Sequence, residues 1–155
     1  MLLWRLSSVR HARAFDGGFG LVNDGRWNTR GRRVTYCSTV PSLAALEKRV
    51  HVTDAALLPP QVMVVYEAPD DLASRTVRIA DLPADWTTNQ AHTQGVGNAW
   101  LDSIAEAILI VPSVVMPIAK APDRNALINH RAANAAAIKI VDALPFVLDP
   151  RLFRP

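Results

Sequence analysis

Apolar and polar residues are arranged along the chain in short runs that are typical of β-strands. The run QVMVVYEA is almost wholly apolar, as expected for a central strand with both faces buried. The run RVTYCS instead alternates, which places Val34 and Tyr36 on one face and Thr35 and Cys37 on the other. The remaining predicted strands are LLWRLS, SRTVRIAD, ILIVPSVVMPI and FVLD.

The segment PSLAALEKRVH predicts a helix that begins at Pro41, because proline fits the first helical turn. At about 100° per residue, Leu43, Leu46 and Val50 share one apolar stripe. Glu47 lies at the flank of this stripe, one turn after Leu43, which is an unusual place for a carboxylate. It is either a partly exposed acid paired with a neighbouring base, or a carboxylate held in a site of low dielectric constant.

A second helix is predicted over NAWLDSIAEA, because Trp100, Ile104 and the next residue after the segment, Ile108, recur every fourth residue. Pro112 interrupts the apolar run that follows, which indicates a bulge or the end of a strand. The tail then reads as an asparagine-rich turn, a short alanine-rich segment and the strand FVLD. Strands and helices do not alternate as βαβ units. We therefore expect an α+β, or mixed α/β, fold with a largely antiparallel sheet, in a single domain over residues 1–155.

The composition is that of an ordinary globular chain, since 155 residues, half of them apolar and 20% charged, suffice for one hydrophobic core. A formal charge of +3 is too small by itself to indicate a nucleic-acid-binding protein. The single cysteine excludes an internal disulfide and a cage of thiolates around a metal, and the four histidines show no ligand spacing. No apolar run is long enough for a signal peptide or a bilayer span, so we expect a soluble, cytoplasmic protein without a metal site or membrane contact.

The segment directly before the strand RVTYCS concentrates glycine and positive charge. It holds five of the seven glycines of the chain and four arginines, Arg26, Arg30, Arg32 and Arg33. Glycines at this density indicate backbone that needs unusual dihedral angles or approaches another group closely. The basic turn could bind nucleic acid or a pyrophosphate, or could be a solvated hairpin without a role in binding.

Several single residues carry candidate chemistry beside a structural alternative. Arg26 is either a solvated arginine or a bidentate ligand of phosphate, and Tyr36 is either a core aromatic residue or a stacking platform. Ser113 follows the strand-breaking proline, where its hydroxyl either satisfies exposed backbone or belongs to a site. Cys37 is expected to be a buried strand residue and not a nucleophile, although His51 is close to it in the sequence.

Taken in order, the segments GRWN, VTYCS, LAALE, VPS and N…LIN resemble the RES domain family, which comprises toxins of bacterial RES–Xre toxin–antitoxin pairs. The resemblance runs from LWRLS to FVLDPRLF, which is nearly the whole chain. It implies that Glu47, Arg26 and Ser113 are catalytic. It also implies that the substrate is bound by Arg26, Tyr36, Asn28 and Ser113.

The resemblance further implies a fold similar to that of ADP-ribosyltransferases, with a split sheet around a cleft for NAD⁺. Members release nicotinamide from NAD⁺ by hydrolysis or phosphorolysis, and some transfer ADP-ribose to a protein. NAD⁺ is then a substrate, no cofactor is expected, and inorganic phosphate is an optional co-substrate. Whether water, phosphate or a protein accepts the ADP-ribose stays open. A catalytically inactive interaction domain and a nucleic-acid-binding module are the alternatives from other functional classes.

The chemistry of NAD⁺ agrees with the residues that the resemblance selects. A pyrophosphate requires an arginine fork, which Arg26 offers, and a nicotinamide ring requires an aromatic partner, which Tyr36 offers. Cleavage of the N-glycosidic bond builds an oxocarbenium-like ribose, which the Glu47 carboxylate can stabilise. Ser113 would position Glu47 or the ribose. The other three arginines of the basic turn are then charges at its rim.

The family also implies a partner, an Xre-type antitoxin that blocks the NAD⁺ cleft, and growth arrest through depletion of NAD⁺. No direct DNA binding by this chain is implied, and a homo-oligomer within the toxin–antitoxin complex is left open. The chain departs from the family pattern in two places. NHRAAN, from Asn129 to Asn134, lacks the usual proline and displaces the histidine, and Thr29 stands where proline is usual. These departures concern loop geometry and the acceptor more than the cleavage of NAD⁺.

Overall fold

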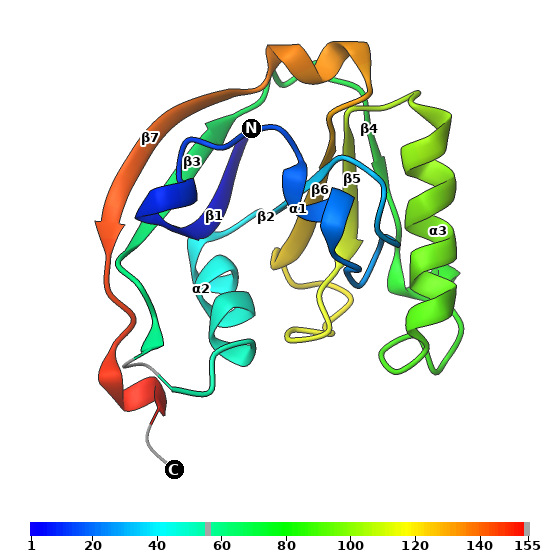
Figure 1. The fold of residues 1–155 in the computed structure, drawn as a ribbon. Helices are drawn as coiled ribbons and strands as arrows, with labels where there is room; N and C mark the ends of the chain where they lie inside the picture. The colour runs from blue at the N-terminus through cyan, green and yellow to red at the C-terminus, as the bar shows by residue number, and fades with distance from the viewer. Residues whose placement is uncertain (55–56, 154–155) are drawn as a thin grey trace.

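The computed structural model describes residues 1–54 and 57–153 as one seven-stranded sheet with helices around it (Figure 1). The strands are β1 (Leu2–Ser8), β2 (Val34–Ser38), β3 (Gln61–Glu67), β4 (Ser74–Thr76), β5 (Ile108–Pro112), β6 (Arg124–Asn129) and β7 (Lys139–Phe146). The helices are α1 (Gly18–Val22), α2 (Pro41–Val50) and α3 (Gln90–Ser103), with short 3-10 helices η1 (Val9–His11), η3 (Ile79–Asp81), η4 (Ala133–Ala137) and η5 (Pro150–Phe153). The strand order is β4-β5-β6-β2-β1-β3-β7, and of the described pairings only β4 with β5 is parallel.

Two half-sheets meet at a single residue pair. β1 pairs with β3 along its whole length, and β2 pairs in the same way with β6, but β1 and β2 share only the pair Trp4–Ser38. In Figure 1, β1, β3 and β7 therefore diverge from the half-sheet that contains β2, β6, β5 and β4. The expected mixed α/β fold, with a split and largely antiparallel sheet, is confirmed.

The alternation of RVTYCS assigns residues to the two faces of the sheet. Cys37 is buried in a cluster on one face, together with residues of β3, β5 and β6. Val34 and Tyr36 belong to a cluster on the other face, which α3 covers. The second cluster contains Trp27 and Trp100, each 1% exposed, and Trp86, which is 4% exposed. Three of the four tryptophans of the chain therefore pack on this face.

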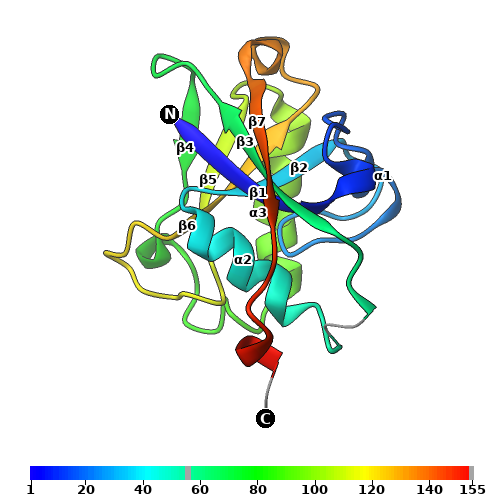
Figure 2. The ribbon, with the colours of Figure 1, turned by 90° about the vertical axis from the view of Figure 1, so that its left-hand side faces the viewer.

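α2 lies beneath the point where the half-sheets diverge (Figures 1 and 2). It begins at Pro41, as predicted, and Leu43 is fully buried. Leu46 is only half-buried and Val50 is 57% exposed, so the predicted apolar stripe contacts the protein mainly through its first turn. Ala44 of the same turn packs in a cluster with Leu6, Met63 and Leu148.

The second helix lies earlier in the chain than its pattern suggested. α3 begins at Gln90 and not at Asn98, and it ends at Ser103. Ile104 has left-handed backbone with φ of 50°, and Ile108 is the first residue of β5. The spacing of four that suggested a continuous helix therefore spans a helix end, a turn and a strand. None of the helices in the described ranges is long and apolar enough to cross a membrane.

Three predicted connections or strands also differ in the structure. The glycine-rich segment contains the short helix α1, where only a loop was expected. The strand predicted over SRTVRIAD is limited to β4, because the chain turns into η3. The asparagine-rich turn is in fact strand β6, and the last strand is β7, which ends at Phe146 where the predicted strand FVLD began. Strands such as β6 and β7 depend on pairing and burial more than on intrinsic preference, so local composition did not reveal them.

Gly97 of α3 provides a direct test of how the helix packs. A Cβ atom at this position would overlap the backbone carbonyl of Trp27, whereas a Cβ at Gly95 meets nothing within 4 Å. We expect Gly97→Ala to lower the free energy of unfolding by about 1–3 kcal/mol, because the helix must move away from the Trp27 backbone. Gly95→Ala should raise it by about 0.5–1 kcal/mol, because alanine is the better helix former. Urea unfolding of both variants makes the comparison, and equal effects would contradict the close contact.

Candidate active site

The turn that carries Arg26 is closed by its own backbone and by Tyr36. Gly25 and Asn28 form an isolated bridge, with the Gly25 N–H donating to the Asn28 carbonyl at 2.9 Å. The Tyr36 hydroxyl accepts a hydrogen bond from the Trp27 N–H at 3.1 Å and donates one to Asn28 Oδ1 at 2.7 Å. A Cβ at Gly25 would lie 2.5 Å from the Tyr36 hydroxyl oxygen. Glycine is therefore needed here because the turn approaches Tyr36 closely.

Polar side chains of α3 hold the same turn from the opposite side. The Thr93 hydroxyl donates to the Arg26 carbonyl at 2.7 Å, and Gln94 Nε2 donates to the carbonyls of Gly25 and Asn28 at 3.0 and 3.3 Å. Trp27 extends from the turn into the core beneath α3. The backbone on either side of Arg26 is thus fixed, while its side chain is not used in any of these contacts.

The guanidinium of Arg26 includes a buried donor without an acceptor. Its Nη1 atom is inaccessible to solvent and has no hydrogen-bond partner in the described part of the chain. Arg26 is close enough to Tyr36 to act electrostatically on its hydroxyl. Burial, the larger effect, raises the pKa of Tyr36 above its usual value, against lowering by the Trp27 N–H and by Arg26, so the phenol stays neutral. A buried arginine N–H without an acceptor is costly, so this donor is available to an acceptor from outside the chain.

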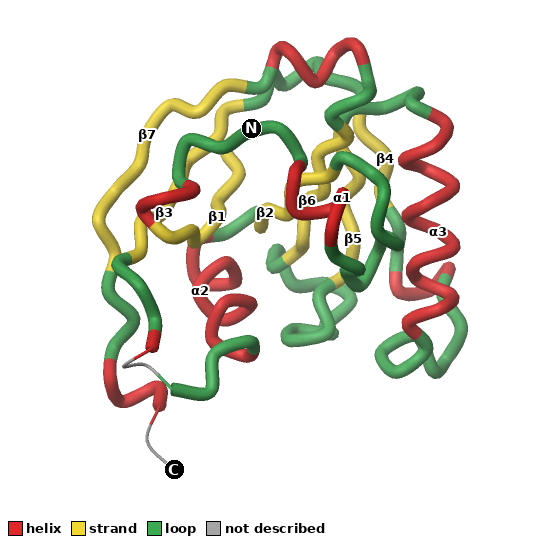
Figure 3. Tube along the Cα trace, in the orientation of Figure 1, coloured by secondary structure: helices red, strands yellow, loops and turns green. Residues whose placement is uncertain are grey.

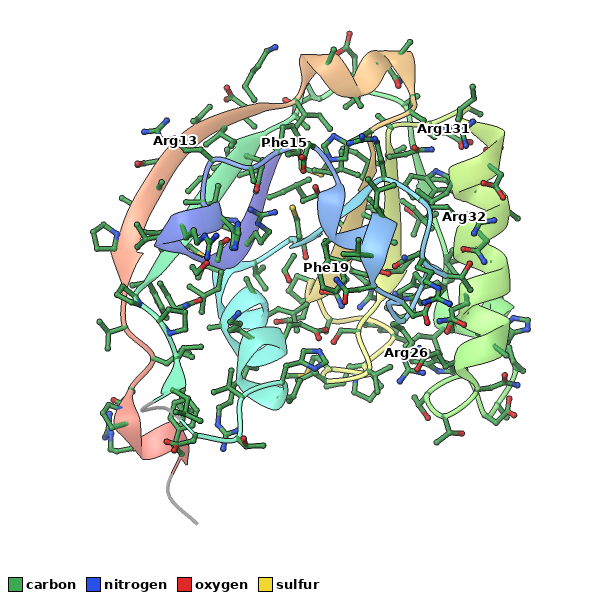
Figure 4. The ribbon with its side chains drawn as sticks, viewed as in Figure 1. Arg13, Phe15, Phe19, Arg26, Arg32 and Arg131 are labelled. Atoms are coloured by element: carbon green, nitrogen blue, oxygen red, sulfur yellow. The ribbon has the colours of Figure 1, made fainter. Side chains whose placement is uncertain are left out.

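An exposed aromatic residue borders Tyr36. Phe19 of α1 is 57% exposed, and its ring lies edge-on to that of Tyr36 with 6.4 Å between the centroids. Figure 4 shows Phe19 and Arg26 in the region between α2 and α3. The sequence offered no reason to select Phe19, because its position beside Tyr36 results from the packing of α1 on β2.

The Glu47 carboxylate is held by two donors on a single oxygen. Ser113 Oγ donates to Glu47 Oε1 at 2.7 Å, and Asn125 Nδ2 donates to the same oxygen at 2.6 Å. Oε2 receives no hydrogen bond from residues 1–54 or 57–153 among those the structure describes. Glu47 is half-buried, so it lies at the flank of its helix as the sequence predicted. The carboxylate is therefore oriented by one oxygen and open at the other.

The Ser113 hydroxyl bonds to the backbone that follows Pro112 and also contacts Glu47. Its side chain is fully buried, and its hydroxyl oxygen accepts hydrogen bonds from the backbone N–H groups of Val115 and Met116 at 3.0 and 3.2 Å. These two bonds stabilise the start of the long β5–β6 loop, drawn in green in Figure 3. Since the oxygen is occupied as an acceptor, its one hydrogen is directed to Glu47.

Tyr36 and the Glu47 cluster share one face of the sheet. Ser38 lies two residues after Tyr36 on β2 and therefore on the same face, and it pairs across the ladder with Asn125 of β6. Two residues along a strand span about 7 Å, so the positions that carry Tyr36 and the support of Glu47 are neighbours. Asn125 was not selected as a site residue, because it read as part of a turn, although it is the first residue of the N…LIN segment. Its role became visible only with β6 in the sheet.

The remaining charged and nucleophilic candidates lie outside this cluster. Arg32 binds Asp102 of α3 at 2.8 Å, a contact whose hydrogen bond lowers the pKa of the carboxyl, and Arg33 donates to the Asp16 carbonyl. Cys37 is buried on the other face, as predicted, and burial raises the pKa of its thiol to about 12. His130, in the segment that departs from the family pattern, contacts the Thr35 hydroxyl at 2.8 Å, also on that other face. None of them adds a group to the Glu47 site.

A model of the RES domain family matches residues 2–149 of this chain. The chain belongs to the RES domain family. It is 36% identical to Toxin Res of Pseudomonas putida over 99% of this chain and the whole of that protein. It is 32% identical to the Prs ADP-ribosylating toxin of a Sphingobium species, with 97% of this chain and 96% of that protein covered.

The fold is shared with a more distant solved structure. A chain in the crystal structure of the Mycobacterium tuberculosis MbcT–MbcA toxin–antitoxin complex superimposes with a TM-score of 0.73, over 98% of this chain and 86% of that chain. The sequence identity of 16% makes this a likeness of fold. The resemblance to the RES domain family that the sequence suggested is thus confirmed in sequence and in architecture.

The two tyrosine hydroxyls of the chain offer a matched test of the turn. Tyr36→Phe leaves the Trp27 N–H and Asn28 Oδ1 without their partner, so we expect a loss of about 1–3 kcal/mol in the free energy of unfolding. Tyr66→Phe removes a buried hydroxyl that has no partner among the described residues, and it should be neutral or stabilising. Thermal and urea unfolding measure both, and a neutral Tyr36→Phe would show that the turn does not depend on this hydroxyl.

Proposed function

We propose that this RES domain chain is the toxin of a toxin–antitoxin pair and cleaves the bond between nicotinamide and ribose in NAD⁺. The observation that carries the proposal is the Glu47 carboxylate, which is held by Oε1 and has no donor at Oε2 among the described residues. It lies on the sheet face that also carries Tyr36 and the Arg26 turn. The names of the relatives, Toxin Res and Prs ADP-ribosylating toxin, support a toxin that acts through ADP-ribose chemistry.

The reaction develops a positive charge on the ribose, which the Glu47 carboxylate can stabilise. The bond between ribose C1′ and the nicotinamide nitrogen breaks, and both electrons go to the ring nitrogen. Nicotinamide therefore leaves as a neutral molecule without protonation, and the ribose becomes oxocarbenium-like. The negative charge of Glu47 stabilises this cation at short range in a half-buried site. One carboxylate is sufficient, because no leaving group has to be protonated.

The neighbouring residues fit the remaining parts of NAD⁺. Arg26 supplies a buried N–H without an acceptor in the described chain, which suits a pyrophosphate oxygen. Tyr36 and the exposed ring of Phe19 supply aromatic surface for the nicotinamide. Asn28 is fully buried and its amide is bonded within the chain, so it serves the substrate by holding Tyr36 and the turn. Ser113 acts in the same indirect way on Glu47.

The acceptor of ADP-ribose defines two candidate activities. If water accepts the ADP-ribose, the chain is an NAD⁺ glycohydrolase, and if inorganic phosphate accepts it, the chain is a phosphorylase. Neither activity needs a cofactor. A protein acceptor would make it an ADP-ribosyltransferase, and the relative named as an ADP-ribosylating toxin favours this second candidate. Nicotinamide leaves in either case. Its release from NAD⁺ by the purified protein, with and without phosphate, therefore tests the shared step first.

The proposed partner is a cognate Xre-type antitoxin that covers the NAD⁺ cleft. The structural neighbour comes from a toxin–antitoxin complex, which supports a protein partner for this fold. The proposed site of action is the cytoplasm, where NAD⁺ is available, and depletion of NAD⁺ would arrest growth.

Glu47→Gln keeps the shape of the carboxylate and removes its charge. We expect the rate of nicotinamide release to fall at least about 100-fold, because the developing cation loses its counter-charge, while NAD⁺ still binds. Glu47→Ala should behave in the same way. Glu67→Gln, an exposed acid at the end of β3, is the matched control and should keep full activity. Chromatography of the released nicotinamide measures these rates, and full activity in Glu47→Ala would contradict the role assigned to Glu47.

Arg26→Ala should act on binding more than on the chemical step. Loss of a charged hydrogen bond to the pyrophosphate costs about 1.5–3 kcal/mol, which weakens NAD⁺ binding roughly 10- to 100-fold. Arg26→Lys should restore only part of this, because an ammonium lacks the planar fork. Arg30→Ala removes an exposed arginine of the same turn and should leave the Kd unchanged. Titration calorimetry on inactive Glu47→Gln protein gives these affinities, and equal effects of Arg26→Ala and Arg30→Ala would contradict a specific contact.

A further inference from the structure

Glu47 is supported by a relay of two hydrogen bonds, which runs from Ser38 on β2 through Asn125 on β6 to the carboxylate. Asn125 uses Nδ2 on Glu47 Oε1 at 2.6 Å, and its Oδ1 accepts a hydrogen bond from Ser38 Oγ at 3.1 Å. Because a carboxylate can only accept, the amide must present its NH₂ group to Glu47 and its oxygen to Ser38. The orientation of Asn125 is therefore determined by its two partners.

The backbone on which this relay is built is rigid. Ser38 and Asn125 face each other in the antiparallel ladder between β2 and β6. Ser38 is 3% exposed, and it is also the residue at which β1 meets β2. Glu47 stands in the last turn of α2, where Glu47, Lys48 and Arg49 are half-buried and Val50 is exposed. Asn125 therefore ties the carboxylate of this helix to the sheet.

The two residues that donate hydrogen bonds to Glu47 Oε1 belong to different parts of the fold. Ser113 orients the carboxylate from the β5–β6 loop, and Asn125 orients it from the sheet. With Oε1 bound twice, the carboxylate cannot rotate without breaking two short hydrogen bonds. Oε2 is then the oxygen that remains for a ligand.

We propose that Asn125, held by Ser38, is a positioning residue that fixes the rotation of the Glu47 carboxylate and presents Oε2 to the reacting ribose. This inference rests on the proposed cleavage of NAD⁺ at the Glu47 site. It assigns Asn125 an effect on the chemical step, through Glu47, and no contact with the substrate.

Several charged or titratable side chains belong to the elements that carry Glu47 and its partners. His51 and Lys48 stand at the end of α2, Arg49 of α2 donates to the Leu152 carbonyl at 2.7 Å, and Arg124, beside Asn125 on β6, donates to the Ile118 carbonyl at 3.1 Å. All of them are present in the wild-type protein and in the Asn125 variants alike. The test therefore uses the ratio of variant to wild-type rate, in which their contribution is common to both.

Asn125→Asp is the decisive variant, because its ability to donate depends on pH. The new carboxyl group, when protonated, would donate to Glu47 as the amide does, whereas two ionised carboxylates in contact repel each other. We expect the ratio of variant to wild-type kcat for nicotinamide release to be highest near pH 5 and to fall at least about tenfold by pH 8. Asn125→Ala should lower kcat by at least about tenfold at every pH, with KM for NAD⁺ changed less than about threefold. Asn134→Asp, in η4 at the far end of the sheet, is the matched control and should follow the wild-type profile (Figure 1).

Each result has a definite meaning. A constant ratio for Asn125→Asp across the pH range would overturn the positioning role, since a merely structural defect scales the rate equally at every pH. If the Asn125 variants do not fold, Ser38→Ala serves instead. It frees the amide from its support and should lower kcat severalfold without raising KM, and full activity would overturn the inference. An inactive wild-type protein would refute the proposed function itself, whereas an active one with unshifted Asn125 variants refutes only this inference.

Discussion

The rest of the structure depends on the single residue pair that joins the two half-sheets. Trp4 and Ser38 are the only paired positions between β1 and β2 in the described chain, so the half-sheets diverge directly beyond them. Trp4 packs with the apolar cluster under α2, and Ser38 begins the hydrogen-bond relay that ends at Glu47. The junction therefore places α2 and orients its carboxylate at the same time. A wider pairing of β1 with β2 would close the space in which α2 lies.

A second constraint fixes the turn that carries Arg26. Trp27 is buried beneath α3, and Gly97 lets the helix approach its carbonyl, so the turn is held through its backbone. The polar groups of Tyr36, Asn28 and Thr93 are satisfied within the chain, but Nη1 of Arg26 has no partner in the part of the chain that the structure describes. This contrast between the satisfied polar groups of the turn and the unpartnered Nη1 atom of Arg26 supports the proposal that Arg26 binds the substrate.

Of the other three arginines near the turn, Arg30 is exposed and the other two are bound within the chain. Arg32 is neutralised by Asp102, which also lies 3.9 Å from Arg131, and Arg33 is bound to a backbone carbonyl. A nucleic-acid interface requires clustered, free positive charge along a surface. The distribution of charge is thus more suitable for a compact anion such as a pyrophosphate than for an extended polyanion.

The sequence by itself determined the fold class, the opening strand, β2, β3, α2 and the family, because these rest on local periodicity and on short motifs. It also selected Arg26, Tyr36, Glu47 and Ser113 as candidates. Tertiary structure alone decided that Ser113 donates to Glu47, that Asn28 is a buried support, and that Phe19 borders Tyr36. It also showed that Asn125, which was expected in a turn, lies in strand β6 and holds Glu47. The contacts that hold Glu47 join residues far apart in the chain, 66 positions for Glu47–Ser113, 78 for Glu47–Asn125 and 87 for Ser38–Asn125, and no local pattern encodes such a distance.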